Sequence, residues 1–202
     1  MKTVVVTGLI GSGKSAVCAL LEQRGIPVYN ADERTKALYD RRPSLVARLE
    51  KALGKPLRLP EGGLDRKALA AVIFSDAAAR EKLEDIVYPL VMQDFLRWKA
   101  RQKENVPFVV LESAVLLSKP LFDGTYDAAV LVTASREVRL SRVMARDGLP
   151  EQAVLARMEA QELPQDKVDA VLTNDGTPEA LSLAVEQTFF DNNSYLCKII
   201  SK

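Results

Sequence analysis

The chain has 202 residues, 48% of them hydrophobic and 27% charged, a composition typical of one folded domain or one domain with an insertion. Its 28 basic and 27 acidic residues give a formal charge of +1, which argues against a nucleic-acid binder that acts through charge alone. Because the chain has no histidine, Ser-His-Asp and Cys-His sites and HExxH zinc sites are excluded, and acid–base chemistry must use carboxylates, lysine, tyrosine or a cofactor.

The two cysteines, Cys18 and Cys197, are far apart and lack metal-ligand spacing, so we expect a reducing compartment. The apolar run at residues 2–7 is too short for a signal peptide or a membrane span. We therefore expect a cytoplasmic protein that binds neither membrane nor nucleic acid. We also expect a monomer, or at most a weak oligomer.

The first predicted elements alternate between strand and helix. They are a strand at 2–7, a helix at 14–24, a strand at 26–30 and a helix at 32–40. Residues 43–104 then show no convincing strand, and Pro56, Pro60, Gly62 and Gly63 mark a loop. Helices are predicted at 64–74, 75–87 and 89–102, with Ser75 and Asp76 as capping residues and Pro89 at the start of the third.

The alternation resumes after this stretch. Strands are predicted at 107–112 and 127–133, helices at 135–147 and 151–162, a weaker strand at 169–173 and a helix at 178–190. Together these elements predict an α/β fold with a parallel sheet covered by helices on both faces. Residues 1–42 and 105–202 would form this core, and 43–104 an all-helical insertion that holds a second substrate. The tail at 191–202 gives no clear prediction.

The segment Gly8-Leu9-Ile10-Gly11-Ser12-Gly13-Lys14-Ser15 matches GxxxxGK[ST], between a predicted strand and a predicted helix. Glycines let backbone N–H groups turn around an anion, and the helix start adds its positive dipole end. Lys14 would reach the β- and γ-phosphates, and the Ser15 hydroxyl would bind Mg²⁺. The expected nucleotide-binding residues are Gly8, Gly11, Ser12, Gly13, Lys14, Ser15 and Ala16. The alternative is a glycine-rich turn without a ligand.

Four classes share such a loop: small-molecule kinases, GTPase switches, ATP-driven motors and nucleotide-regulated binding modules. The guanine-reading NKxD motif is absent from the sequence, and 202 residues leave little room for a motor. The helical insertion after the second strand favours a small-molecule kinase, in which it would hold the acceptor.

Asn30 and Asp32 lie at the carboxyl end of the second predicted strand, the edge at which open α/β sheets bind ligands. Asp32 could accept the proton of an acceptor hydroxyl, or it could cap the following helix. Glu112 ends the strand at 107–112 and could hold Mg²⁺, or it could face water.

Arg139, Arg142 and Arg146 share one face of the helix predicted at 135–147. Such a stripe suggests a lid at about residues 139–165 that closes on the transferred phosphoryl group, although it could be a solvated face paired with Glu137 and Asp147. Asn174, after the last strand, belongs either to a plain turn or to a loop that contacts adenine.

Six segments, in order from about residue 3 to residue 188, resemble dephospho-CoA kinases. They are TGLIGSGKS, VYNADERTKAL, GGLDRKALAAVIFSDAAAREKLEDIVYP, VVLESAVLL, RLSRVMARDGLPEQAVLARMEAQ and VLTNDG. The resemblance implies a P-loop kinase fold with a lid and a helical CoA-binding insertion. It implies ATP-dependent phosphorylation of the ribose 3'-hydroxyl of dephospho-CoA, the last step of coenzyme A synthesis.

The resemblance also assigns roles to single residues. Asp32 matches the family's catalytic base, and Arg139, Arg142 and Arg146 would contact phosphates. The expected catalytic residues are therefore Asp32, Lys14, Arg142 and Arg146, with Arg139 and Asn174 at the nucleotide and Ser15 and Glu112 at Mg²⁺.

Three positions depart from the usual family pattern. Asn30 stands where the family usually has Asp, Tyr88 where it has His, and Ser118 where it often has an acidic residue. On the sequence alone, Asn30→Asp should be tolerated, because it restores the commoner residue. The change to Tyr88 puts in doubt any role of that side chain in acceptor binding.

Overall fold

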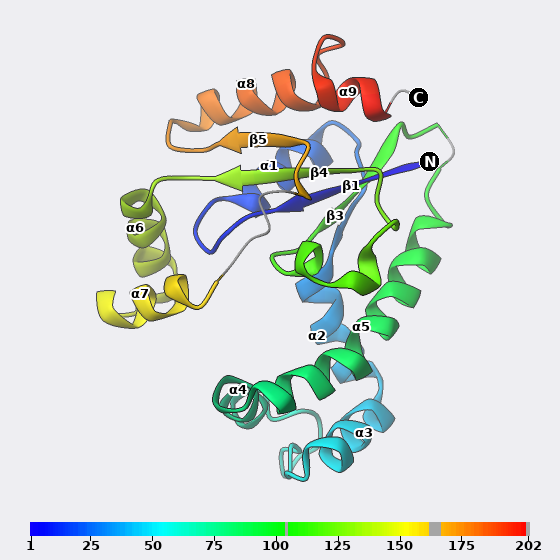
Figure 1. Cartoon of the computed structure of the whole chain (residues 1–202), viewed down its shortest axis with the longest axis vertical. Helices are drawn as coiled ribbons and strands as arrows, with labels where there is room; N and C mark the ends of the chain where they lie inside the picture. Colours follow the sequence, from blue (N-terminus) through cyan, green and yellow to red (C-terminus); the bar gives the residue numbers. More distant parts are fainter. Residues whose placement is uncertain (104, 162–166, 201–202) are drawn as a thin grey trace. The chain divides into compact units, whose positions relative to one another are not determined.

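The computed structural model describes residues 1–103, 105–161 and 167–200, and it divides into two units. The first unit comprises Met1–Asn30 and Gln102–Lys202, and the second comprises Ala31–Arg101 (Figure 1). The division falls before helix α2 (Ala31–Arg41), whereas the sequence analysis placed it after residue 42. The difference arises because α2 packs on helices of the second unit.

A five-stranded sheet forms the centre of the first unit, in the order β2-β3-β1-β4-β5. Its strands are β1 (Lys2–Thr7), β2 (Val28–Asn30), β3 (Phe108–Glu112), β4 (Ala128–Thr133) and β5 (Ala170–Thr173). All pairings are parallel, so the carboxyl ends of the strands share one edge. The predicted parallel sheet flanked by helices is confirmed.

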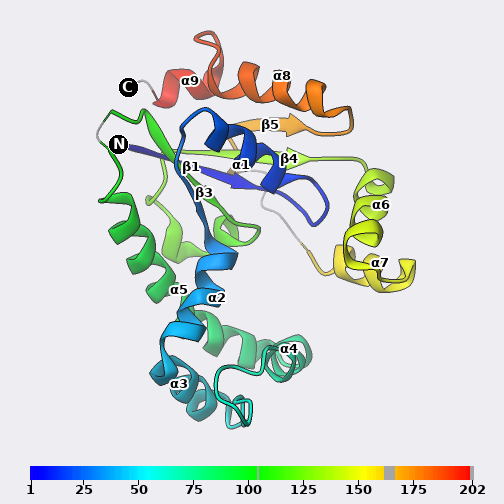
Figure 2. The same ribbon diagram turned by 180° about the vertical axis from the view of Figure 1, so that it is seen from behind.

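One face of the sheet is covered by α1 (Lys14–Gln23), α8 (Pro178–Phe189) and α9 (Tyr195–Ile200) (Figure 2). The core there consists of alternate residues of the strands, such as Val4 and Val6, packed against one side of each helix. Leu196 of α9 is 1% exposed and belongs to this core. The tail, for which the sequence gives no clear prediction, therefore packs on the sheet as far as Ile200.

Two helices follow β4 at the carboxyl edge of the sheet, α6 (Arg136–Asp147) and α7 (Glu151–Glu159) (Figure 1). They pack on each other through Val143, Val154 and Met158. The predicted lid runs on to residue 165, and its part from residue 162 lies outside the described residues. Two short 3-10 helices, Leu116–Ser118 and Pro120–Phe122, follow β3.

The second unit contains α2, α3 (Pro43–Leu53), α4 (Arg66–Ser75) and α5 (Ala77–Lys99). The predicted Asp76 cap is confirmed, because its carboxylate accepts hydrogen bonds from the backbone N–H of Ala78 at 2.9 Å and of Ala79 at 3.1 Å. The predicted helix start at Pro89 is wrong, because α5 is continuous through this residue. Tertiary packing of α5 against α2, α3 and α4 outweighs the loss of one helical hydrogen bond at proline.

Helix α3 lies in a stretch for which the sequence analysis names no element. Its signals are Pro43 in the first turn and the buried Leu45, Val46 and Leu49 on one side. No helix in the described part of the chain is both long enough and apolar enough to span a membrane.

The packing of α9 leads to a stability prediction. Leu196→Ala should lower the free energy of unfolding by about 2–5 kcal/mol, because it leaves a cavity in the core. Tyr195→Ala is the matched control, since Tyr195 is 64% exposed on the same helix and should cost about 0.5 kcal/mol or less. Urea denaturation measures both, and equal effects of the two substitutions would contradict the packing of α9.

Candidate active site

The loop between β1 and α1 is held tightly against its neighbours at two glycines. Gly11 has φ 79° and Gly13 has φ 94°, conformations that side-chain-bearing residues rarely adopt. A Cβ atom on Gly11 would lie 2.6 Å from the carbonyl oxygen of Arg139, and one on Gly13 would overlap the side-chain amide of Asn174. These positions therefore require glycine for close approach as well as for backbone geometry.

Lys14 begins α1 and folds back over the loop. Its Nζ donates to the carbonyl oxygen of Gly8 at 2.7 Å and to that of Leu9 at 3.4 Å. The ammonium thus lies at the loop, where a lysine on a flexible stem can turn toward a phosphate. The N–H of Ala16, an expected nucleotide contact, donates to the carbonyl oxygen of Gly13 at 3.0 Å.

A chain of hydrogen bonds joins Ser15, Glu112 and Asn30. The Ser15 hydroxyl donates to Glu112 Oε1 at 2.8 Å, and Asn30 Nδ2 donates to Glu112 Oε2 at 2.9 Å. The sheet register explains this meeting, because Glu112 pairs with Val6 of β1 on one side and with Asn30 of β2 on the other. Glu112 is 7% exposed, so the alternative in which it faces water is wrong.

Asn174 connects the loop to α6. Its Nδ2 donates to the carbonyl oxygen of Ser12 at 2.9 Å. Its own carbonyl oxygen accepts from Arg142 at 2.9 Å, and its Oδ1 accepts from Arg142 at 3.4 Å. At 5% exposed, Asn174 is a buried bridge rather than a plain surface turn.

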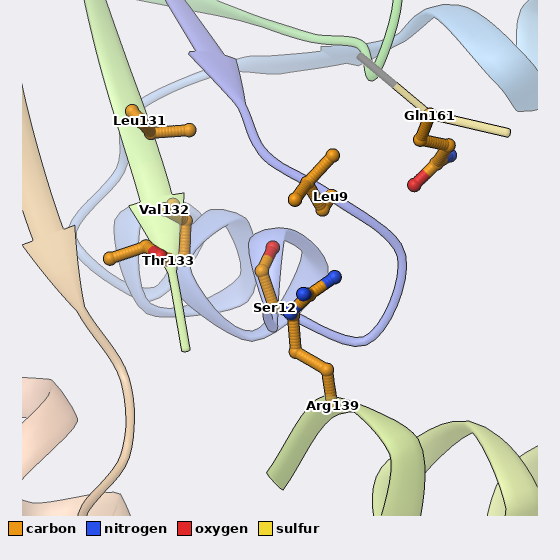
Figure 3. Close-up of a pocket in the computed structure, with 7 residues that line it drawn as sticks. All are labelled: Leu9, Ser12, Leu131, Val132, Thr133, Arg139 and Gln161. Carbon is orange, nitrogen blue, oxygen red and sulfur yellow. The ribbon is translucent and has the colours of Figure 1, made fainter. Parts of the chain in front are cut away.

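A cavity of about 220 Å³ lies on the β4 side of the loop (Figure 3). Its lining residues are Leu9, Ser12, Leu131, Val132, Thr133, Arg139 and Gln161. Arg139 Nε donates to the carbonyl oxygen of Ala134 at 3.2 Å. Its buried NH1 and the buried Ser12 Oγ find no hydrogen-bond partner among the described residues. Buried polar groups of this kind cost free energy unless a ligand or a water molecule forms hydrogen bonds with them, so this cavity suits a polar ligand.

Arg146 does not join the other two arginines. Its side chain is 63% exposed and pairs with Asp147, with Nε and Oδ1 2.7 Å apart. This hydrogen bond raises the pKa of the Arg146 guanidinium and lowers the pKa of the Asp147 carboxyl. Arg146 thus fits the solvated face that the sequence analysis left open, and Arg139 and Arg142 turn to the loop.

Asp32 is exposed in the first turn of α2, in the second unit. The helix begins at Ala31, so Asp32 lies inside it rather than at the residue before it, the position of a side-chain cap. Its negative charge can still interact favourably with the positive end of the helix dipole.

Tyr88, also in the second unit, is held by Glu84: its hydroxyl donates to Glu84 Oε1 at 3.3 Å. Burial of the side chain, followed by the charge of Glu84, raises the pKa of Tyr88.

The sequence analysis missed two contacts of the site. The bond from Asn30 to Glu112 depends on strand order, which pairs β2 with β3 and which no local pattern reveals. Gln161, at the end of the predicted helix 151–162, accepts a hydrogen bond from the backbone N–H of Ile10 at 2.7 Å. This glutamine is the last residue of the segment RLSRVMARDGLPEQAVLARMEAQ, but the resemblance assigned no role to it.

Because Asn30 donates a hydrogen bond to Glu112, we expect Asn30→Asp to be destabilising, in contrast to the expectation from the sequence alone. An aspartate would set a second carboxylate against Glu112, and like charges raise the pKa of such a pair. A raised pKa in the folded state destabilises the fold at neutral pH, and this cost disappears as the pH falls below that pKa. We expect Asn30→Asp to lower the free energy of unfolding by about 1–3 kcal/mol at neutral pH and by clearly less near about pH 5.

Asn30→Ala is the matched control, since it removes the donor without adding a charge. Its cost should change less between the two pH values than that of Asn30→Asp, because it leaves one buried carboxylate instead of two. Urea denaturation of the two variants makes the comparison. A cost of Asn30→Asp that does not change with pH would show that its carboxylate does not interact with Glu112.

Comparisons with known proteins give a consistent result. The family model described as dephospho-CoA kinase matches residues 2–179. A dephospho-CoA kinase of Anaeromyxobacter dehalogenans is 36% identical over 195 residues, which cover 95% of this chain and 92% of that protein. A dephospho-CoA kinase of Frankia casuarinae is 39% identical over 196 residues, covering 95% of this chain and 83% of that protein.

Solved structures agree with these matches. A crystal structure of a Thermus thermophilus protein superposes with a TM-score of 0.77 at 35% identity, covering 92% of this chain and 94% of the other. The structure of dephospho-CoA kinase from Campylobacter jejuni has a TM-score of 0.66 at 24% identity, covering 93% of this chain and 95% of the other. At this lower identity the likeness establishes the fold alone.

Proposed function

Because the chain belongs to the dephospho-CoA kinase family, as its resemblance predicted, we propose that it transfers the γ-phosphoryl group of ATP to the ribose 3'-hydroxyl of dephospho-CoA. The product is coenzyme A, and the reaction is the last step of its synthesis. The observation that carries the proposal is the family match over residues 2–179, which includes the phosphate loop and extends through Asn174. As a member of this family, the chain is a kinase.

The loop residues Gly8, Gly11, Ser12 and Gly13 would hold the phosphates of ATP through backbone N–H groups. The Lys14 ammonium would add charge-assisted hydrogen bonds to the β- and γ-phosphates. Arg142, which Asn174 connects to the loop, would supply a second cation for the same phosphates. The NH1 of Arg139, which has no hydrogen-bond partner among the described residues, supports its assignment to the nucleotide as well.

The donor set at Ser15 and Glu112 fits Mg²⁺, which prefers oxygen ligands and combines one or two carboxylates with substrate phosphates. No cluster of three or more acidic or thiol side chains suited to a metal occurs in the described part of the chain, so phosphate oxygens would complete the coordination. A bound Mg²⁺ would neutralise part of the phosphate charge. Asn30 holds Glu112 in place for this role.

Asp32 is proposed as the group that orients the acceptor hydroxyl and takes its proton. The support is its match to the family's base and the absence of histidine. Its exposed carboxylate in the first turn of α2 is open to a ligand. The second unit begins at Ala31, so it contains Asp32 together with most of the insertion at 43–104 that is expected to bind dephospho-CoA.

Asp32→Asn should lower kcat by about 10²–10⁴-fold and leave the KM for ATP nearly unchanged, because it removes the base but not the phosphate contacts. Asp40→Asn is the matched control in α2, where Asp40 pairs with Arg66 on the surface. Steady-state kinetics with dephospho-CoA and a thermal melt test both variants. A large drop in melting temperature with a modest loss of rate would assign Asp32 to helix stability instead.

The different surroundings of the arginines predict a graded response. Arg142→Ala should lower kcat by at least about 100-fold, since its cation lies beside the phosphate loop. Arg146→Ala should change kcat by about threefold or less, because it removes an exposed ion pair. Equal effects of the two substitutions on kcat would contradict the separation of these side chains.

The proposed reaction itself is tested by incubating the protein with ATP, Mg²⁺ and dephospho-CoA and measuring coenzyme A by mass spectrometry. ADP release without a phosphorylated acceptor would favour a kinase for another acceptor, and binding of ATP without its turnover would favour a binding module. The cytoplasmic location and the monomeric state stay predictions.

A further inference from the structure

Gln161 ties the end of the α6–α7 segment to the phosphate loop. It follows α7 by two residues, and its Oε1 accepts from the backbone N–H of Ile10 at 2.7 Å. In Figure 3 its carboxamide is turned toward the loop, at the rim of the cavity that Ser12 and Arg139 also line. The bond joins residues 151 positions apart in the chain, so it is a tertiary contact and not part of a local turn.

Three consecutive loop residues are connected to the α6–α7 segment, two by direct contact and the third through Asn174. Ile10 bonds Gln161 through its N–H, and its side chain packs against the cluster of Val143, Val154 and Met158. Gly11 lies against the backbone of Arg139, with no room for a Cβ atom. Ser12 is joined to Arg142 through Asn174. The shape of the loop and the placement of the arginines therefore depend on each other.

Gln161 is uncharged, which suits a position beside a loop that binds phosphates. Its carboxamide oxygen accepts from Ile10 as a carboxylate would, but it adds no negative charge beside a loop that binds phosphates. Alanine or leucine would leave the loop N–H without an acceptor, and the loop could then shift relative to α6. A shift of about 1 Å can cost about 100-fold in rate when reacting groups depend on position.

We propose that Gln161 is a positioning residue for phosphoryl transfer, which acts by fixing the phosphate loop against the segment that carries Arg142. This inference rests on the proposed function, since it assigns Arg142 to the transferred group. Gln161 itself need not touch the nucleotide. Gln161 affects the rate by holding the loop in place relative to Arg142, so its effect on kcat should require that Arg142 is present. A general contribution to stability would lower the rate whether or not Arg142 is present.

A double-mutant cycle on kcat tests the dependence. Gln161→Leu keeps the size of the side chain and removes the acceptor, and we expect it to lower kcat by about tenfold or more with little change in the KM for ATP. In the Arg142→Ala background the same substitution should cost about twofold or less, because the group that it misplaces is already absent. Gln161→Glu, which keeps an acceptor oxygen, should retain more of kcat than Gln161→Leu and should raise the KM for ATP.

Gln152→Leu is the matched control, because Gln152 is an exposed glutamine of α7. A thermal melt of each variant confirms that it is folded. A loss of kcat in Gln161→Leu of about twofold or less, or an equal loss in both backgrounds, would overturn the proposal.

A second measurement does not depend on turnover. NMR of the full chain should show faster hydrogen exchange of the Ile10 amide in Gln161→Leu and a shifted signal of the Arg142 Nε–H, with neither change in Gln152→Leu. An unchanged Arg142 signal would overturn the proposal. Failure of the wild-type chain to form coenzyme A would instead overturn the proposed function, and the NMR comparison would still decide whether Gln161 positions the loop and Arg142.

Discussion

A buried carboxylate at the end of β3 is the constraint around which the first unit is arranged. A charge that is 7% exposed is stable only where donors surround it, and Glu112 obtains them from α1 and from β2. The two bonds fix the start of α1 and the end of β2 on either side of β3. Burial and the charge of Glu112 also raise the pKa of the nearby Cys18 thiol, which keeps that side chain neutral. The carboxylate therefore organises the edge of the sheet that the phosphate loop shares.

Most elements of the first unit were predictable because their signals are local. Buried parallel strands are short apolar runs, and each helix between them has its own amphipathic face. Prediction failed where tertiary packing overrides a local rule. Pro89 should end or start a helix, yet α5 runs through it, because the helix packs on α2, α3 and α4 and has buried residues on both sides of the proline. The docking of Leu196 could not be predicted either, since the surface that it buries is built from strands far away in sequence.

The site shows the same difference between local sequence signals, which can be recognised, and tertiary contacts, which cannot. The phosphate loop is contiguous, and the residue types required at each position can be recognised in the sequence itself. Arg139, Arg142 and Arg146 share a helix face, but only the structure shows that Asp147 pairs with Arg146, whereas Arg142 reaches Asn174. The roles of Asn30 and Gln161 depend on which segments meet, and spacing along the chain carries no information on that.

Side-chain amides recur where this site needs a fixed contact beside negative charge. Asn30 donates to Glu112, Asn174 donates to the loop while its oxygens accept from Arg142, and Gln161 accepts from Ile10. An amide can donate and accept in one group, and it carries no charge. Carboxylates in the last two positions would repel the phosphates, and one at position 30 would repel Glu112. Glu112 thus keeps its negative charge where a cation can use it, and neutral amide groups hold the backbone around it in place.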